Sequence, residues 1–548
     1  MRALLILVSL VLAAPVAGVL LSWVRLDEQA LAVLSHQAQT VMAGYAGQSL
    51  LLAAGVAVGT AVLGVATAVA VALFRFPGQR FFEWGLLLPM AMPAYVLAYV
   101  ATDALQPSGA LQQALRQALG ATGADASRPL WPDVRSLGGA IPLFVLCLYP
   151  YVYLLTRTAL GERAVQMMEA ARLLGADLPR RLWTVALPLA RPAVVAGVAL
   201  ALMETLADYG VGAYFGLATF TTGIYRAWLS MNDPVAASQL ASLLLLVVAA
   251  LLALERRAQS RLRFVTSRAG AVQAAEARPV VLRGRVAWAA CALCALPVVL
   301  GFALPVAWLL AMVWREAQYG ELGLPWARFG QWAWATFRLA GVSAVAAVAI
   351  ALALAFTLRL QGGTTDASRA SGALRAAARV LSLGYAVPGA VVAIGILVPL
   401  GWAQARWPDT ALTPWFTGTL LGVLYAYLVR FSSVALQSVE AGYARVPASV
   451  DETARMLGAS RARVFWRLHL PLLRRPALAA MLLVFVDVMK ELPATLVLRP
   501  FGSDTLAVVA YNLARDERLA EAALPSLAIV LVGLLPVVLL SRALREPA

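Results

Sequence analysis

Lysine is almost absent from this chain of 548 residues: Lys490 is the single one, and Glu491 follows it inside an apolar run. A P-loop needs a lysine beside its glycines to reach the phosphates of ATP, so no Walker A motif is present. Histidine is equally scarce, because His36 and His469 are the only two. This scarcity argues against a histidine-based metal site.

Cysteine is also rare, and all three copies lie in apolar runs: Cys147, Cys291 and Cys294. The last two have the C-x-x-C spacing of redox and metal sites. No histidine or acidic residue accompanies them, so we expect small packing residues within a helix.

Charged residues make up only 13% of the chain and hydrophobic residues 61%, with a mean hydropathy of +0.79. A soluble protein could not bury so much apolar surface, so the composition predicts an all-α polytopic membrane protein. The first apolar run resembles a signal peptide, but its length favours a retained span. Twelve runs are long enough to span a bilayer: about 3–24, 49–74, 84–103, 138–158, 192–211, 234–254, 286–314, 337–358, 381–404, 415–437, 476–498 and 523–541.

The net charge of +16 is distributed unevenly between the loops. Alternate loops carry net charges between +2 and +6, whereas the intervening loops are close to neutral. This is the positive-inside pattern, so the basic residues indicate topology and not a nucleic-acid partner. It predicts that both termini lie in the cytoplasm.

One soluble segment occurs twice, 283 positions apart, on the side predicted to be cytoplasmic. We call residues 161–191 the first repeat segment and residues 444–475 the second repeat segment. In each, a Glu precedes a Gly by six residues, and a Leu-Pro pair follows. The corresponding residues are Glu169, Gly175, Leu187 and Pro188 in the first, and Glu452, Gly458, Leu470 and Pro471 in the second.

The pattern predicts a helix, a break and a second helix. Glu169 suits the first turn of a helix, where a carboxylate complements the helix dipole. Gly175 provides a permissive backbone for the turn, and the second helix is expected to end at Leu187-Pro188, before the next span begins. An ordinary amphipathic loop would explain one copy, but not two copies with identical spacing.

The repeat divides the chain into two pseudo-symmetric halves of six spans each, residues 1–255 and 285–548, joined by a cytoplasmic linker at 256–284. In the outer loop 104–136, Leu111, Leu115 and Leu119 share one helical face, ahead of Gly120. This short helix is expected to lie on the outer membrane surface or to contact an external partner.

Charged residues also recur at the same offset within two spans. Glu204 and Asp208 correspond to Asp487 and Glu491, and Lys490 lies close enough to pair with Asp487. Charges inside a membrane are costly and therefore mark functional candidates. The four carboxylates suit a translocation path for a cation in transient contact with them, without a fixed metal site. Alternatively, they pair and cap backbone broken at glycines and Pro493, which would hold a gate closed.

The repeat segments resemble the EAA loop of ABC-importer permeases. The first copy matches throughout, whereas the second has Thr453 in place of the middle alanine, which makes the two copies slightly unequal. The resemblance implies a type I ABC importer fold without enzymatic activity of its own. It also implies two copies of a separate ATPase subunit, which hold the ATP and Mg, while this chain binds no cofactor. The residues implied to couple to the ATPase are Glu169, Ala170, Ala171, Gly175, Leu187, Pro188, Glu452, Thr453, Ala454, Gly458, Leu470 and Pro471.

Residues 203–228 and 486–507 resemble the fused permeases of bacterial ferric-iron importers. That resemblance implies inward transport of Fe³⁺ from a periplasmic binding protein across the bacterial inner membrane, by alternating access. Related permeases carry thiamine or other small solutes, and a polyamine would also accept a negative lining. An ion-coupled secondary transporter is the alternative from another class, but it gives the repeat segments no role.

Overall fold

The computed structural model describes residues 2–25, 28–120, 129–160, 165–265, 280–320, 323–361 and 368–543. These residues are almost entirely helical, as the composition predicted. Residues 266–279 of the linker predicted at 256–284 lie outside the described residues. The chain forms two compact units. Unit 1 comprises residues 1–37, 224–245 and 325–509, and unit 2 comprises residues 38–223, 246–324 and 510–548.

The core of unit 2 consists of three long helices, α3 (Met42–Leu73), α7 (Leu137–Ala159) and α10 (Leu187–Ala207). Small residues allow them to approach closely. A Cβ atom at Gly55 or Gly59 of α3 would lie within 2.6 Å of a side chain of α7, and one at Gly197 of α10 would lie 2.7 Å from the α7 backbone. Packing between these helices therefore requires glycine at these positions.

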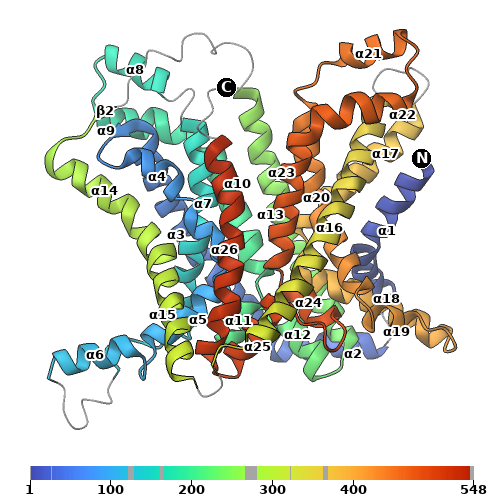
Figure 1. The fold of residues 1–548 in the computed structure, drawn as a ribbon, viewed down its shortest axis with the longest axis horizontal. Coiled ribbons are helices and arrows are strands. Elements are labelled where there is room, and N and C mark those ends of the chain that lie inside the picture. Colours follow the sequence, from blue (N-terminus) through green and yellow to red (C-terminus); the bar gives the residue numbers. More distant parts are fainter. Residues whose placement is uncertain are drawn as a thin grey trace. The chain divides into compact units, whose positions relative to one another are not determined.

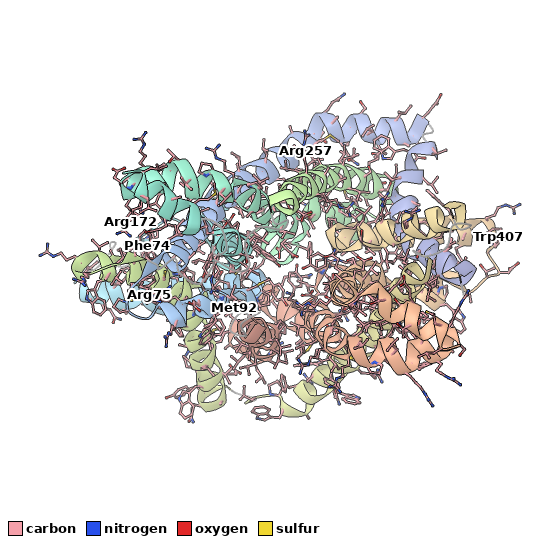
Figure 2. The ribbon with its side chains drawn as sticks, turned by 90° about the horizontal axis from the view of Figure 1, so that it is seen from above. Phe74, Arg75, Met92, Arg172, Arg257 and Trp407 are labelled. Carbon is pink, nitrogen blue, oxygen red and sulfur yellow. The ribbon has the colours of Figure 1, made fainter. Side chains whose placement is uncertain are left out.

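Other helices of unit 2 surround this core. The helical path is interrupted at Met92 and Pro93. On either side of this interruption, α4 (Gln79–Gly85) with its 3₁₀ extension and α5 (Ala94–Leu105) are bent by 86° relative to each other. Of the remaining helices, α14 (Gly284–Val298) packs against α3, whereas α15 (Leu304–Tyr319) and α26 (Leu519–Ala543) pack against each other and against α5. A two-residue strand β1 (Phe74–Arg75), labelled in Figure 2, pairs in parallel with β2 (Val280–Val281). This pairing attaches the end of the linker region to the end of α3.

Two shorter helices lie at opposite ends of unit 2 (Figure 1). One is α6 (Ala110–Ala118), which confirms the helix predicted in the loop 104–136, with Gly120 at φ 68° after it. Leu111, Leu115 and Leu119 are all exposed on it. The other is α8 (Val165–Leu173), in the first repeat segment.

Unit 1 has a similar core of α16 (Trp326–Gln361), α20 (Leu421–Tyr443) and α23 (Leu470–Met489). The first helix of the chain, α1 (Arg2–Leu21), packs against α18 (Gly389–Arg406), where Gly18 and Gly395 permit backbone contact. Other helices that lie wholly or partly in unit 1 are α2 (Glu28–Thr40), α12 (Phe220–Tyr225), α13 (Pro234–Val265), α17 (Ser368–Leu381), α19 (Leu412–Thr417), α21 (Ala448–Met456), α22 (Arg461–Val464), α24 (Pro493–Leu498) and α25 (Leu506–Arg515).

The compact units cut across the two halves defined by the repeat. Unit 1 takes α1 from the start of the chain, and unit 2 takes α26 from its end. Unit 1 also takes residues 224–245 from the first half, and unit 2 also takes residues 285–324 from the second, so each unit contains spans from both halves of the sequence. The halves 1–255 and 285–548 describe the duplication in sequence, whereas the units describe how the helices pack.

The predicted spans correspond to helices in the described residues. Nine helices are long and apolar enough to cross a membrane, and the bent pair at 79–105 makes a tenth. The remaining two predicted spans, 415–437 and 476–498, fall largely on α20 and α23, which carry charged residues and are not among those nine. The all-helical polytopic architecture is confirmed.

Candidate functional site

The first repeat segment folds as a helix, a turn and a second helix. At the end of α8, Gly175 has φ 83°, and the next residue, Ala176, donates its N–H to the Ala171 carbonyl at 3.0 Å. These features form a Schellman C-cap, which favours glycine because of the positive φ. The next helix, α9 (Leu178–Arg181), is capped by Asp177, whose carboxylate accepts from the Arg180 N–H at 3.3 Å.

The second repeat segment has the same construction. Gly458 has φ 70° after α21, and the Ala459 N–H bonds to the Ala454 carbonyl at 3.1 Å. Ser460 caps α22 in place of the aspartate. The hydroxyl of Thr453 donates to the Ser449 carbonyl at 2.9 Å, so this departure from the alanine pattern is accommodated within the helix.

Both segments expose large apolar side chains immediately before the glycine. Leu174 is 88% exposed and Met456 is 89% exposed, and their neighbours Leu173 and Leu457 are exposed to a similar degree. Exposed apolar residues that cluster in this way are typical of a protein interface. The sequence contains these apolar residues as Leu-Leu-Gly and Met-Leu-Gly at the 283-residue offset. The predicted coupling residues before each turn, however, were chosen from the glutamate, the small residues after it and the glycine, so the exposed apolar pair was missed.

The prediction for Glu169 was wrong in detail, because this residue lies beyond the first turn of α8 and pairs with Arg172 at 3.2 Å. Glu452 likewise lies beyond the first turn of α21. The small residues match between the copies: Ala170 and Thr453 are exposed, whereas Ala171 and Ala454 are half-buried.

The second helix of each segment was predicted to end at Leu-Pro, and this was also wrong. In unit 2, α9 continues through a π-helical turn (Leu182–Ala186) into α10, so residues 178–207 form one helical path. In unit 1, α22 continues through the π turn Phe465–His469 into α23. Pro188 and Pro471 cannot donate a backbone hydrogen bond, and a π turn before each accommodates the loss. Leu187, Pro188 and Leu470 are half-buried there and Pro471 is exposed.

The predicted membrane carboxylates lie where α10 and α23 are interrupted. In unit 2, Asp208 ends α10 and accepts the N–H of Val211 at 2.8 Å, which caps the short helix α11 (Gly210–Tyr214). In unit 1, Glu491 accepts the N–H groups of Ala494 at 2.9 Å and Thr495 at 3.1 Å, which caps α24. The two residues at the 283-residue offset therefore make equivalent backbone contacts.

Glu491 has a further buried partner that sequence reasoning missed. Arg430 of α20 donates to its Oε1 at 3.0 Å, and the Glu491 side chain is only 1% exposed. Asp487 pairs with Lys490 at 2.9 Å, as predicted, and both remain partly exposed. Glu204, which corresponds to Asp487, is half-buried in unit 2. Asp208 and Glu491 are thus the carboxylates that cap the broken helices.

Among the described residues there is no group of three or more His, Cys, Asp and Glu side chains arranged to hold a metal ion. Cys294 is fully buried in the apolar core between α14 and its neighbours, and Cys291 packs against the same cluster. Packing therefore accounts for the C-x-x-C spacing.

The long apolar helices, together with the two repeat segments that continue into α10 and α23, define a polytopic membrane protein with a duplicated construction. Residues 60–263 and 367–545 both match the family described as the inner membrane component of binding-protein-dependent transport systems. The chain belongs to this family, and it carries two such components in one polypeptide. It is therefore a permease of the ABC importer type.

Relatives of the chain differ in the substrate for which they are named. The Fe(3+)-transport system permease protein FbpB 2 of Haemophilus influenzae is 23% identical over 511 residues, which are 91% of this chain and 90% of that protein. The putative 2-aminoethylphosphonate permease PhnV of Salmonella typhimurium is 31% identical over 30% of this chain and 60% of its own length. The molybdenum permease ModB of Escherichia coli is 29% identical over 25% of this chain and 55% of its own length.

Proposed function

We propose that this chain is the membrane subunit of an ATP-driven importer in which α8 and α21 each dock on one copy of a separate ATPase subunit. The observation that carries the proposal is the pair of repeat segments with the same C-cap geometry and with exposed apolar side chains just before the glycine, Leu174 in the first and Met456 in the second. Burying these two side chains in a partner is favourable by about 1.5–3 kcal/mol each. ATP and Mg belong to the partner, and this chain does no chemistry.

The uninterrupted path from each repeat segment into a span supports mechanical coupling. Since α9 continues into α10 and α22 into α23, a movement of either soluble segment is passed to a membrane helix without an intervening loop. ATP binding would draw the two ATPase copies together and move both segments. The spans then rock and open the path toward the binding protein, and hydrolysis and product release reset it.

We propose ferric iron as the substrate, delivered by a periplasmic binding protein. Support comes from the iron permease FbpB 2, which aligns over 91% of this chain, whereas the relatives named for other substrates align over less than a third of it. Glu204 and Asp487 supply the carboxylate oxygens that a hard cation prefers. Of the residues assigned to the gate, Asp208 in unit 2 and Glu491 in unit 1 cap the broken helices, and Lys490 pairs with Asp487.

The proposed orientation places the repeat segments and both termini in the cytoplasm, as the loop charges predict. In unit 2, α6 lies at the end opposite to α8 (Figure 1), which puts its exposed leucines on the periplasmic side. There α6 rests on the outer surface of the bilayer.

Purification with the ATPase co-expressed from the same genome tests the docking step. The expected result is a complex with two ATPase copies for each permease chain, measured by native mass spectrometry. A Leu174→Asp and Met456→Asp double variant is expected to purify alone, because a buried carboxylate without a partner is costly. A double variant that retains both ATPase copies would remove the proposed interface.

A further inference from the structure

A buried polar network lies beneath the second repeat segment. Asp451, on the inner side of α21, accepts from Nε of Arg359 at 2.6 Å through Oδ2, and its Oδ1 lies 2.6 Å from Nε2 of His469. The side chains of Asp451 and His469 are 8% and 1% exposed. These three residues therefore form a connected group shielded from water.

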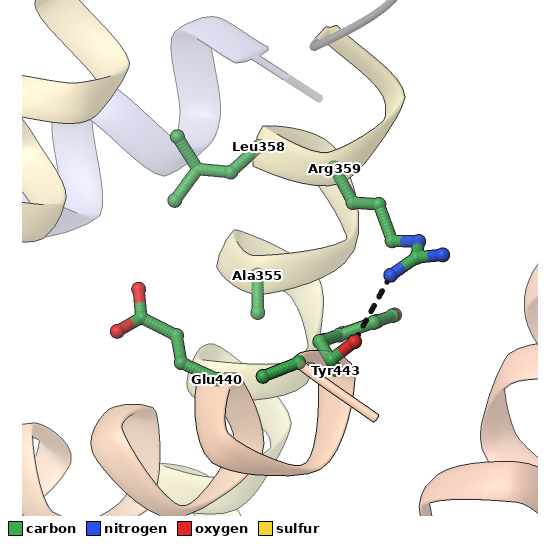
Figure 3. A pocket seen from close by; sticks show the side chains of 6 residues that line it. Ala355, Leu358, Arg359, Glu440 and Tyr443 are labelled. Atoms are coloured by element: carbon green, nitrogen blue, oxygen red, sulfur yellow. Dashed lines mark hydrogen bonds between the residues drawn. The ribbon is translucent and has the colours of Figure 1, made fainter. Parts of the chain in front are cut away.

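Arg359 connects α16 to two further parts of unit 1. Its Nη1 donates to the Tyr443 carbonyl at 3.1 Å, and its Nη2 donates to the carbonyls of Val446 and Pro447, each at 2.8 Å. These carbonyls belong to the end of α20 and to the turn before α21. Figure 3 shows Arg359 and Tyr443 beside a cavity of about 240 Å³, which Glu440 also lines. One side chain near the end of α16 thus holds α20, the turn and α21.

His469 extends the network to α23. It is the last residue of the π turn that leads into α23, and its ring contacts Phe356 of α16 and Tyr443 of α20, with centroids 5.2 and 5.4 Å apart. Through these contacts four helices, α16, α20, α21 and α23, meet at one buried carboxylate.

The first repeat segment uses different chemistry at the matching positions. At the 283-residue offset, Leu160 replaces Tyr443, Met168 replaces Asp451 and Ala186 replaces His469. In unit 2 these residues form a buried apolar cluster with Leu73, at the end of α3. The soluble helix α8 is therefore anchored by apolar contacts, which have no preferred direction, whereas α21 is anchored by hydrogen bonds and ion pairs of fixed geometry.

We infer that Asp451 is a positioning residue that fixes α21 to α16 and α23, so that the second repeat segment passes its movement to the spans more rigidly than the first. This inference rests on the proposed function, since the movement comes from the ATPase. Loss of the carboxylate would let α21 shift without α16, and ATP would then be hydrolysed without transport.

Reconstitution of the complete complex in proteoliposomes tests the inference, with a ferric-loaded binding protein and ATP. The measured quantity is the amount of ATP hydrolysed for each iron ion taken up. We expect Asp451→Asn to retain the ATPase and to raise this ratio roughly fivefold or more. Asp451→Glu, which keeps the carboxylate, is expected to restore coupling in large part. Met168→Leu, a near-isosteric change at the matching position, is expected to leave the ratio close to that of the original chain.

A second variant separates coupling from folding. The combined change Arg359→Leu, Asp451→Met and His469→Ala leaves no charge buried without a partner, so the packing is expected to be retained. This variant should bind the ATPase and still show the raised ratio. An unchanged ratio in it, or in Asp451→Asn, would overturn the inference. If the original chain fails to bind the ATPase, the proposed function fails instead.

Discussion

The turn at Gly458 offers a substitution whose cost comes from the backbone alone. Gly458 has φ 70°, and a Cβ atom at this position would meet no atom within 4 Å. Alanine therefore fits sterically, but a left-handed backbone costs an L-residue about 1–2 kcal/mol. That cost shifts the equilibrium between the native turn, which orients α21 and α22, and other conformations by roughly 5- to 30-fold away from the native turn.

We expect Gly458→Ala to weaken binding of the ATPase by about that factor, measured as the Kd of purified ATPase for the permease in nanodiscs. Two controls separate the backbone from the added methyl group. Gly458→Asn should bind more tightly than the alanine variant, because asparagine tolerates the left-handed region. Gly330→Ala, in the helix α16 with equally open space, should bind like the original chain. An alanine variant with unchanged Kd, or an asparagine variant that is weaker still, would refute the reasoning.

Three further predictions concern the interface, the path and pH. Leu174→Asp alone should weaken ATPase binding by at least about 1–2 kcal/mol, measured as Kd, whereas Leu119→Asp on α6 should not change it; equal effects of the two would contradict the assigned interface. Glu204→Gln combined with Asp487→Asn should lower iron uptake while ATPase binding persists, and unchanged uptake would leave these carboxylates without a role in the path. Burial lowers the pKa of His469 below 6.5, although Asp451 opposes this shift and the other facing groups are Arg359 and Tyr443. The unfolded chain therefore binds a proton at His469 more readily than the folded chain does. As a result, the free energy of unfolding should fall as the pH drops below about 6.5. The Tm of the original chain should then decrease between pH 7.5 and 5.5 by more than that of His469→Gln, and equal decreases would contradict the assignment.

The features with a regular period or an exact repeat could be predicted from the sequence. Apolar length alone locates the helices, and the 283-residue offset locates both repeat segments and the glycine turns at Gly175 and Gly458. These features depend on local chemistry: a positive φ requires glycine, and a run of about 20 apolar residues requires a helix.

The features that depend on tertiary contacts could not be predicted in this way. The continuous helix through Leu187-Pro188 depends on a π turn, while a proline pattern alone favours a helix end. The network at Asp451 has no counterpart at Met168, so a comparison of the two copies conceals it. The packing of α1 in unit 1 depends on contacts with α18, more than 350 residues away in the sequence.

Transport by the purified chain with and without the ATPase tests the central claim most directly. Proteoliposomes would contain the permease with its ATPase and ferric-loaded binding protein, and iron uptake would be followed with radioactive iron. We predict uptake only when the ATPase and ATP are both present, and none from a proton or sodium gradient across liposomes that hold the permease alone. Uptake driven by such a gradient without the ATPase would contradict this claim.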